Sequence, residues 1–310
     1  MPESPITKVA VIGAGTIGAS WTAAFLSRGL EVVAYDPSPN APDLIRRTID
    51  AAWPILLRLG ATPGADPTKW RFETDPVRAV VGAQFVQESA PERYEVKATL
   101  LPPISAVLGP EVVIASSSSG LLGSRLREGC RHPGRVLVGH PFNPPHLIPL
   151  VEVVSGPGTD PAAVARAMEF YRAAGKYPIE IRKEVPGHLA NRLQAALWRE
   201  AVHLVADGVA SVADVDAAIS EGPGLRWALM GPHATFHLAG GEGGMAHFMD
   251  HLMPAVTSWW ADLGEPKVTP DLAAQLVAGV AEEVDGKTVP ELAARRDAFL
   301  TALLELRRRT

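Results

Sequence analysis

The sequence predicts an α/β fold class, with a twisted, mostly parallel sheet covered by helices on both faces and followed by an all-α C-terminal domain. Three observations predict it. Short β-branched runs alternate with helical patterns along the first part of the chain, the glycine-rich sequence GAGTIG follows the first run, and no convincing strand appears after Leu189. We place the domain boundary near Pro186, with residues 1–186 in the first domain and 187–310 in the second.

The first strand of the predicted sheet is KVAVIG (residues 8–13), a short apolar run that ends in glycine. A helix is expected over residues 16–28, closed by Gly29, and LEVVAYD (residues 30–36) follows as a second strand. Strand, helix and strand in so short a segment form a βαβ unit, whose two strands are parallel.

Four more runs have the composition of strands: residues 83–89, 111–117, 135–140 and 150–154. Helical patterns lie between several of them, over residues 94–108 and 161–174. This alternation continues the parallel sheet and places helices on both of its faces.

The C-terminal part has helical patterns only. NRLQAALWREAVHLVADG (residues 191–208) reads as a long helix stopped by Gly208, and Ser211 is a candidate N-cap for the next helix. The chain closes with a charged helical pattern over residues 289–310.

Composition excludes several classes of protein. A net charge of −5 argues against nucleic acid or an anionic membrane as the main partner. Cys130 is the single cysteine, which rules out an intrachain disulfide and favours the cytoplasm. Glu3 and two prolines stand where a signal peptide would be basic and apolar, and no apolar run approaches the roughly 18 residues of a membrane span.

The sequence Gly13-Ala14-Gly15-Thr16-Ile17-Gly18 has the spacing of a dinucleotide-binding turn between a strand and a helix. Gly13 would make the tight turn, Gly15 would let the backbone approach a pyrophosphate, and Gly18 would let helix and strand pack closely. The pyrophosphate would lie on the free amides of the helix N-terminus, at Thr16 and Ile17. The alternative is a glycine-rich turn without a ligand.

Asp36 ends the second strand, where a carboxylate binds the 2′-hydroxyl of the adenosine ribose. The same charge repels a 2′-phosphate, and the residues that follow, Pro37-Ser38-Pro39, offer no arginine to offset it. The pattern therefore favours NAD over NADP as the cofactor.

His140 follows a strand and precedes Pro141, so it lies at the edge of the sheet where open α/β folds bind ligands. A dehydrogenase acting on an alcohol needs a base for the hydroxyl proton, and histidine suits that role near neutral pH. Glu152, inside the apolar run LVEVV, is the candidate carboxylate that orients the imidazole. The alternative is a core histidine and an exposed strand glutamate.

Six ordered motifs then show a family resemblance: GAGTIG, QESAPERYEVK, SSSSG, GHPFNP, PLVEVV and PGHLANRL. Together they resemble the L-3-hydroxyacyl-CoA dehydrogenase superfamily along nearly the whole chain. The resemblance implies a Rossmann-type domain, NAD as cofactor, and a homodimer formed through the helical domain.

The resemblance also implies roles for single residues. His140 is similar to the catalytic base of the family and Glu152 to its carboxylate partner. Ser119 matches the serine that contacts the substrate oxygen, and Asn191 matches the asparagine that completes the site. Three positions match cofactor contacts: Glu92, Lys97 and Asn143.

Two regions bear on the substrate. Acyl-CoA members typically read S-N-T-S-S where this chain has SSSSG at residues 116–120. Residues 222–254 resemble the branch acting on small polar 3-hydroxy acids, namely L-carnitine dehydrogenase, L-gulonate 3-dehydrogenase and lambda-crystallin. We expect oxidation of a 3-hydroxyl to a 3-oxo acid, with L-carnitine as the first candidate substrate. L-gulonate, a short-chain acyl-CoA, and a non-catalytic crystallin-like NAD-binding protein remain alternatives.

Carnitine carries a carboxylate and a quaternary ammonium group. Arg226 could pair with the carboxylate, Trp227 and Phe236 could offer aromatic faces to the cation, and Glu242 could add negative charge. Core packing or an interface ion pair is the alternative for each. His247 and His251 lie one helical turn apart, but the glutamate of H-E-x-x-H and a third ligand are missing, so no metal is predicted.

Overall fold

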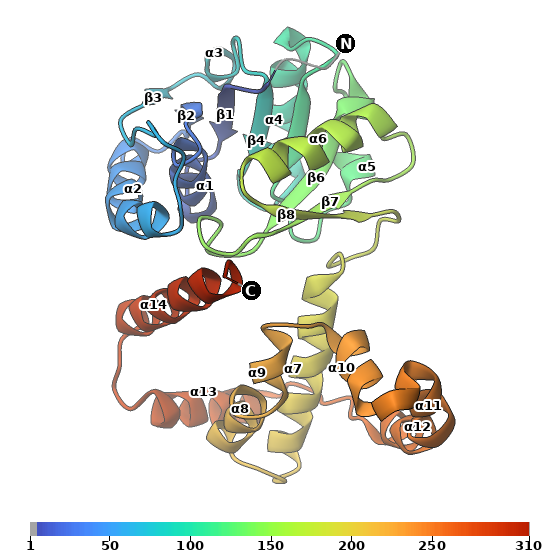
Figure 1. Ribbon diagram of the computed structural model, residues 1–310. Coiled ribbons are helices and arrows are strands. Elements are labelled where there is room, and N and C mark those ends of the chain that lie inside the picture. The colour runs from blue at the N-terminus through green and yellow to red at the C-terminus, as the bar shows by residue number, and fades with distance from the viewer. Residues whose placement is uncertain (1–4, 310) are drawn as a thin grey trace. The chain divides into compact units, whose positions relative to one another are not determined.

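A computed structural model describes residues 5–309 of the chain, which divide into two compact units. The first unit holds residues 5–192 together with Asp297–Arg309, and the second holds Leu193–Arg296 (Figure 1). The boundary near Pro186 stays a prediction from sequence. Glu3, which entered the argument on the signal peptide, lies outside the described residues.

In the described part of the chain, eight strands of the first unit form one sheet in the order β3-β2-β1-β4-β5-β6-β7-β8. All neighbouring strands are parallel except β6 and β7, which are antiparallel, so the predicted mostly parallel sheet is confirmed. The strands are β1 (Lys8–Ile12), β2 (Glu31–Tyr35), β3 (Trp70–Glu73), β4 (Phe85–Glu88), β5 (Val113–Ser116), β6 (Val136–Pro141), β7 (Leu150–Val154) and β8 (Tyr177–Ile181).

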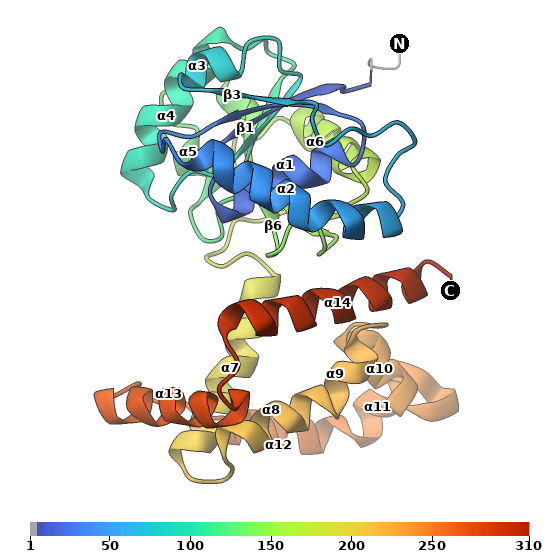
Figure 2. The same cartoon turned by 90° about the vertical axis from the view of Figure 1, so that its left-hand side faces the viewer.

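Helices cover both faces of this sheet (Figures 1 and 2). Alternate residues of β1 show the two layers, because Val9 and Val11 pack in one buried cluster while Ala10 and Ile12 pack in the other. The first cluster lies under α1 (Thr16–Leu26), α2 (Ala41–Arg58) and α6 (Pro161–Ala173). The second lies under α3 (Pro76–Ala79), α4 (Tyr94–Val107) and α5 (Gly123–Leu126); a short 3₁₀ turn, η1 (Pro133–Arg135), precedes β6.

The second unit is helical throughout its described residues, as the sequence predicts. Ser211 caps its helix by accepting the N–H of Asp214, also as predicted. The helices are α7 (Ala190–Ala206), α8 (Val212–Ser220), α9 (Pro223–Trp227), α10 (Pro232–Ala239), η2 (Gly241–Gly243), α11 (Gly244–His251), α12 (Met253–Asp262), α13 (Pro270–Val284) and α14 (Val289–Arg307).

The end of α14 belongs to the first unit. Arg58 of α2 donates two hydrogen bonds of 3.1 Å to the carboxylate of Glu305, which fastens the two helices together. No helix among the described residues is long and apolar enough to cross a membrane.

Six elements of the first unit were not expected from the sequence: the short helical segments α3, α5 and η1, the long helix α2, and the strands β3 and β8. Helix α2 is amphipathic, with Ile45, Ile49 and Leu56 buried at helical spacing, but Pro54 interrupts its pattern. Strands β3 and β8 are the two edges of the sheet. An edge strand tolerates polar residues and a proline such as Pro178, which hide the alternation that identifies a strand.

Candidate active site

The two halves of the predicted catalytic pair face each other across the antiparallel strands β6 and β7, where His140 is the register partner of Glu152. Directly opposite residues point to the same side of a sheet, so the turn between the strands returns Glu152 to His140. Nδ1 of His140 lies 2.7 Å from Oε2 of Glu152, and both side chains are buried. The alternative of an exposed strand glutamate is therefore wrong.

The remaining oxygen of Glu152 is bound by backbone. Oε1 accepts the N–H groups of Leu189 at 3.0 Å and of Ala190 at 2.8 Å, where α7 begins. Burial alone would raise the pKa of Glu152, but hydrogen bonds from His140 and these two amides outweigh it and hold the pKa below its ordinary value. The ionised carboxylate therefore accepts the Nδ1 proton of His140 and leaves Nε2 free to accept a proton.

A residue that the sequence motifs contained but did not single out, His188, lies beside this pair. Its ring centroid is 5.4 Å from that of His140, and its side chain is 1% exposed. His188 and the preceding Gly187 have positive φ angles of 50° and 74°, so the chain turns sharply just before the amides that bind Glu152. In the sequence, the one feature that could have pointed to His188 was its imidazole beside apolar residues in the junction segment PGHLAN.

The ring of His188 is neutral. Nε2 lies 3.0 Å from the carbonyl oxygen of Ser118 and therefore donates, while Nδ1 is buried without a hydrogen-bond partner among the described residues. Burial lowers the pKa of His188, and a positive charge on His140 lowers it further, although the Ser118 carbonyl acts in the opposite direction. His188 thus connects the start of α7 to the serine run without adding charge beside His140.

Glu92 organises the serine run. Its Oε1 accepts the hydroxyl of Ser118 at 2.7 Å and the N–H groups of Ser119 and Gly120 at 2.9 Å each. Burial raises the pKa of Glu92, but these hydrogen bonds and the charge of Lys97 prevail and lower it. Asn191 completes the arrangement, because its side-chain amide donates to the carbonyl of Ser119 at 3.5 Å.

Lys97 is almost completely buried beneath this loop. Its ammonium group contacts both oxygens of Glu88, at 2.7 and 2.8 Å, and lies 3.9 Å from Glu92. A buried lysine needs such a partner, and this one fixes the loop that carries Glu92. The role of Lys97 and Glu92 as direct cofactor contacts stays a prediction, as does that of Asn143, an exposed residue after β6.

The glycine-rich turn has the shape that a dinucleotide needs. Gly13 has a φ of 93°, and a Cβ there would meet the backbone of Ala90 at 2.5 Å; a Cβ on Gly18 would meet the Gly13 carbonyl at 1.8 Å. A Cβ on Gly15 would meet nothing within 4 Å. The turn is thus closely packed at Gly13 and Gly18 and open at Gly15. Gly15 precedes the N-terminus of α1, where Thr16 and Ile17 lie and no side chain caps the helix.

Asp36 lies beside this turn at the end of β2. One of its oxygens accepts the N–H of Ala14 and the other the N–H of Ser38, both at 2.8 Å. Each oxygen retains a second lone pair for a hydroxyl donor. The first unit therefore has the residues that would hold NAD, with Asp36 oriented by the glycine turn itself.

The predicted substrate residues lie in the second unit: Arg226 and Trp227 on α9, Phe236 on α10 and Glu242 on η2. Trp227 and Phe236 are 41% and 42% exposed, and Phe236 also packs on Phe248, so neither is a fully buried core residue. Their contact with substrate stays a prediction. No group of three metal-binding side chains occurs among the described residues, although the rings of His247 and His251 stack.

Comparisons with known proteins agree with this geometry. Residues 8–185 match the model of the 3-hydroxyacyl-CoA dehydrogenase NAD binding domain, and residues 187–278 match that of the 3-hydroxyacyl-CoA dehydrogenase C-terminal domain. The L-carnitine dehydrogenase of Streptomyces coelicolor is 51% identical over 98% of this chain and 95% of its own. That of Bacillus cereus is 46% identical over 99% and 94%.

Solved structures show the same fold. A 5-formyl-3-hydroxy-2-methylpyridine 4-carboxylic acid 5-dehydrogenase, described as an NAD+-dependent dismutase, has a TM-score of 0.82 at 32% identity and covers 98% of both chains. The 3-hydroxybutyryl-CoA dehydrogenase of Escherichia coli K12 has a TM-score of 0.65 at 30% identity, over 76% of this chain and 50% of its own.

Proposed function

The chain belongs to the 3-hydroxyacyl-CoA dehydrogenase family, and on that premise we propose that it oxidises L-carnitine at its 3-hydroxyl to 3-dehydrocarnitine, with NAD as oxidant. It is an NAD-dependent oxidoreductase acting on CH–OH groups. The observation that carries the proposal is the buried His140–Glu152 pair, which supplies an oriented base in a chain about half identical to several L-carnitine dehydrogenases.

The chemistry of the pair follows from its hydrogen bonds. Glu152 holds the Nδ1 proton of His140, so Nε2 accepts the proton of the substrate hydroxyl. The carboxylate then stabilises the imidazolium that forms. A bound NAD would supply the acceptor for the hydride of the carbon that bears this hydroxyl, and the loss of proton and hydride would convert the alcohol to a ketone. Leu189 and Ala190 keep Glu152 ionised throughout by binding its other oxygen.

We assign Ser119 and Asn191 to the reacting oxygen. Both lie in the hydrogen-bonded network that joins the serine run to the start of α7. The Ser119 hydroxyl is exposed and, apart from a long 3.5 Å contact with Glu92, remains available to donate. A donor to the substrate oxygen orients the alcohol and stabilises the carbonyl as it forms.

Arg226 suits the carnitine carboxylate, since a guanidinium pairs with it through two hydrogen bonds, and Trp227, Phe236 and Glu242 suit the quaternary ammonium. These four assignments rest on residue chemistry. We also assign the chain to the cytoplasm, because its one cysteine requires no oxidising compartment.

The active protein in this proposal is a homodimer joined through the helical unit. That unit leaves several large apolar side chains exposed: Trp198, Leu229, Trp259 and Trp260 are each at least 60% exposed. Large apolar side chains with this much exposure are typical of residues that a second copy covers.

A substrate panel tests the activity. Purified protein is supplied with NAD, and then with NADP, together with L-carnitine, D-carnitine, L-gulonate or L-3-hydroxybutyryl-CoA, and reduced cofactor is followed by absorbance. We expect the highest kcat/KM with L-carnitine and NAD. A higher value with L-gulonate or the acyl-CoA would contradict the substrate assignment, and no turnover with any of them would favour a non-catalytic NAD-binding protein.

A further inference from the structure

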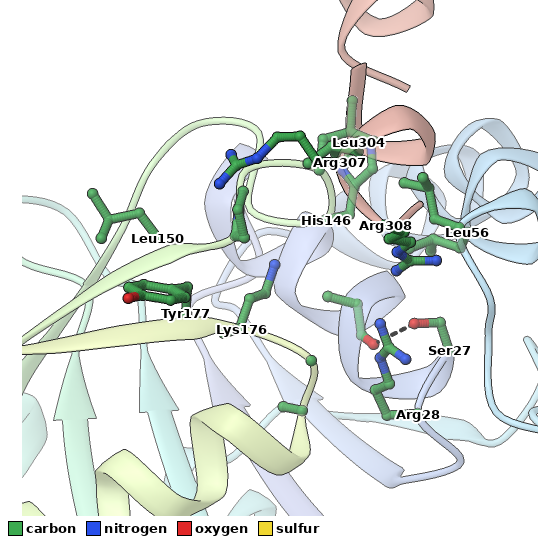
Figure 3. Close-up of a pocket in the computed structure, with 16 residues that line it drawn as sticks. Ser27, Arg28, Leu56, His146, Leu150, Lys176, Tyr177, Leu304, Arg307 and Arg308 are labelled. Carbon is green, nitrogen blue, oxygen red and sulfur yellow. Dashed lines mark hydrogen bonds between the residues drawn. The ribbon is translucent and has the colours of Figure 1, made fainter. Parts of the chain in front are cut away.

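The first unit contains a cavity of about 470 Å³ outside the catalytic network (Figure 3). Its walls come from the ends of α1 and α2, the segment 146–150, the turn between α6 and β8, and the end of α14. Segment 146–150 belongs to the connection between His140 and Glu152, so one wall of the cavity is continuous with the chain that carries the catalytic pair.

Positively charged side chains dominate the polar lining of this cavity. Arg28 from the turn after α1, Lys176 from the turn between α6 and β8, and Arg308 just past the end of α14 face it from three separate segments, as Figure 3 shows. None of the residues that line it is aspartate or glutamate. Glu305, one turn from Arg308 on the same chain segment, is already paired with Arg58.

These cations are close enough to repel one another. Burial lowers the pKa of Arg28, and the charge of Arg308 lowers it further. Arg28 donates to the carbonyl of Gly60 at 3.1 Å, and its guanidinium also lies against Gly175. It is therefore held in place, with its charge uncompensated by the residues around the cavity.

Lys176 is bound by backbone carbonyl groups. Its ammonium donates to the carbonyl oxygens of Pro145 and Ile148, which also belong to the connection between the catalytic residues. Burial and the charge of Arg28 lower the pKa of Lys176 to about 7. A bound anion would reverse both effects, because it favours the protonated amine and shields it from Arg28.

The rest of the lining is apolar and includes Leu56, Leu147 and Leu304. We propose that this cavity is a binding site for a small organic polyanion, whose phosphate or carboxylate groups pair with Arg28, Lys176 and Arg308. A single monovalent ion would fill little of the volume and could not reach all three cations. A molecule with two or more charges can span them while its carbon frame contacts the leucines.

Calorimetric titration of the NAD-bound protein tests the site, since NAD excludes the probes from the glycine-rich turn. The probes are pyrophosphate and citrate, which distinguish phosphate from carboxylate recognition. We expect at least one to bind, with a Kd raised about tenfold or more in each of Arg28→Gln, Lys176→Met and Arg308→Gln. Arg46→Gln, an exposed arginine of α2 outside the cavity, should leave the Kd unchanged.

A second measurement follows the proton on Lys176. At pH 8, where citrate is fully ionised, binding of citrate should take up protons in the wild type and fewer in Lys176→Met, which titrations in two buffers of different ionisation enthalpy would reveal. If neither probe binds at roughly 10 mM, about tenfold above the weakest KM values typical of metabolites, the proposal is overturned. Equal affinities in wild type and Arg308→Gln, the variant on an exposed helix end that is least expected to disturb folding, would also overturn it.

Discussion

Glu152 lies directly opposite His140 across β6 and β7 and binds its Nδ1 at 2.7 Å. The same carboxylate accepts two backbone N–H groups from the start of α7, so one side chain connects His140, the sheet and the first helix of the C-terminal part. A buried carboxylate with three donors is ionised at neutral pH, and this fixes both the tautomer and the direction of the imidazole.

Replacing Glu152 with glutamine should preserve the shape of the pair and remove its charge. The glutamine oxygen can still accept the amides of Leu189 and Ala190, which turns its NH₂ group toward His140. That arrangement favours the tautomer with the proton on Nε2, so kcat should fall by about 10² to 10⁴. The value of kcat/KM should fall as well, and an unchanged kcat would contradict the role of Glu152.

His140→Asn should lower kcat by about 10² to 10⁴, because the general base is lost. NAD affinity, measured by quenching of protein fluorescence, should change by less than about threefold, because the glycine turn and Asp36 are untouched. His132→Asn, a histidine before η1, serves as the control and should retain wild-type activity. Substantial activity in His140→Asn would exclude His140 as the base.

His188→Phe should change the pH dependence of stability. The folded state holds the pKa of His188 below the unfolded value of about 6.5, so the unfolded chain binds more protons and stability falls as pH drops through 6.5. Phenylalanine cannot titrate, so the free energy of unfolding of the variant should depend less on pH between 7.5 and 5.5. Urea unfolding at several pH values in this range measures that dependence. The same variant loses the bond to Ser118, so kcat should fall while KM for NAD holds. If the free energy of unfolding depends on pH equally in the variant and the wild type, folding does not shift the pKa of His188.

Asp36→Asn should weaken the preference for NAD. The asparagine retains the size of the side chain but no longer repels a 2′-phosphate, so the ratio of kcat/KM for NAD over NADP should fall about tenfold. Asp43→Asn, an exposed carboxylate in the first turn of α2, is the matched control and should keep the wild-type ratio. If both variants show the same ratio, a residue other than Asp36 discriminates between NAD and NADP.

Trp260→Glu should disrupt the proposed homodimer. Trp260 is 60% exposed on α12, and a charge on a face covered by a second copy would be buried without a partner. Sedimentation velocity should show a monomer at a concentration where the wild type is dimeric. Val81→Glu changes an equally exposed apolar residue of the first unit and should leave the dimer intact. A Trp260→Glu dimer would move the interface to another surface.

Local patterns in the sequence determined most strands and helices of the first unit and the form of the glycine-rich turn. The β-branched run before Gly13, the spacing of the three glycines and the position of Asp36 indicate a strand, a turn and a second strand because each depends on neighbouring residues. The helices over 94–107 and 161–173 follow for the same reason. The family motifs suggested catalytic roles for His140 and Glu152, where composition alone equally allowed a core histidine and an exposed strand glutamate.

Only the tertiary structure decided how these pieces meet. The amides of Leu189 and Ala190 and the ring of His188 are distant from Glu152 and Ser118 in sequence, and no local preference specifies their contact. The edge strands β3 and β8 depend on pairing with β2 and β7, so their own residues predict them poorly. The cationic cavity likewise exists because α14 returns to α2, and long-range packing fixes such contacts while local propensity does not.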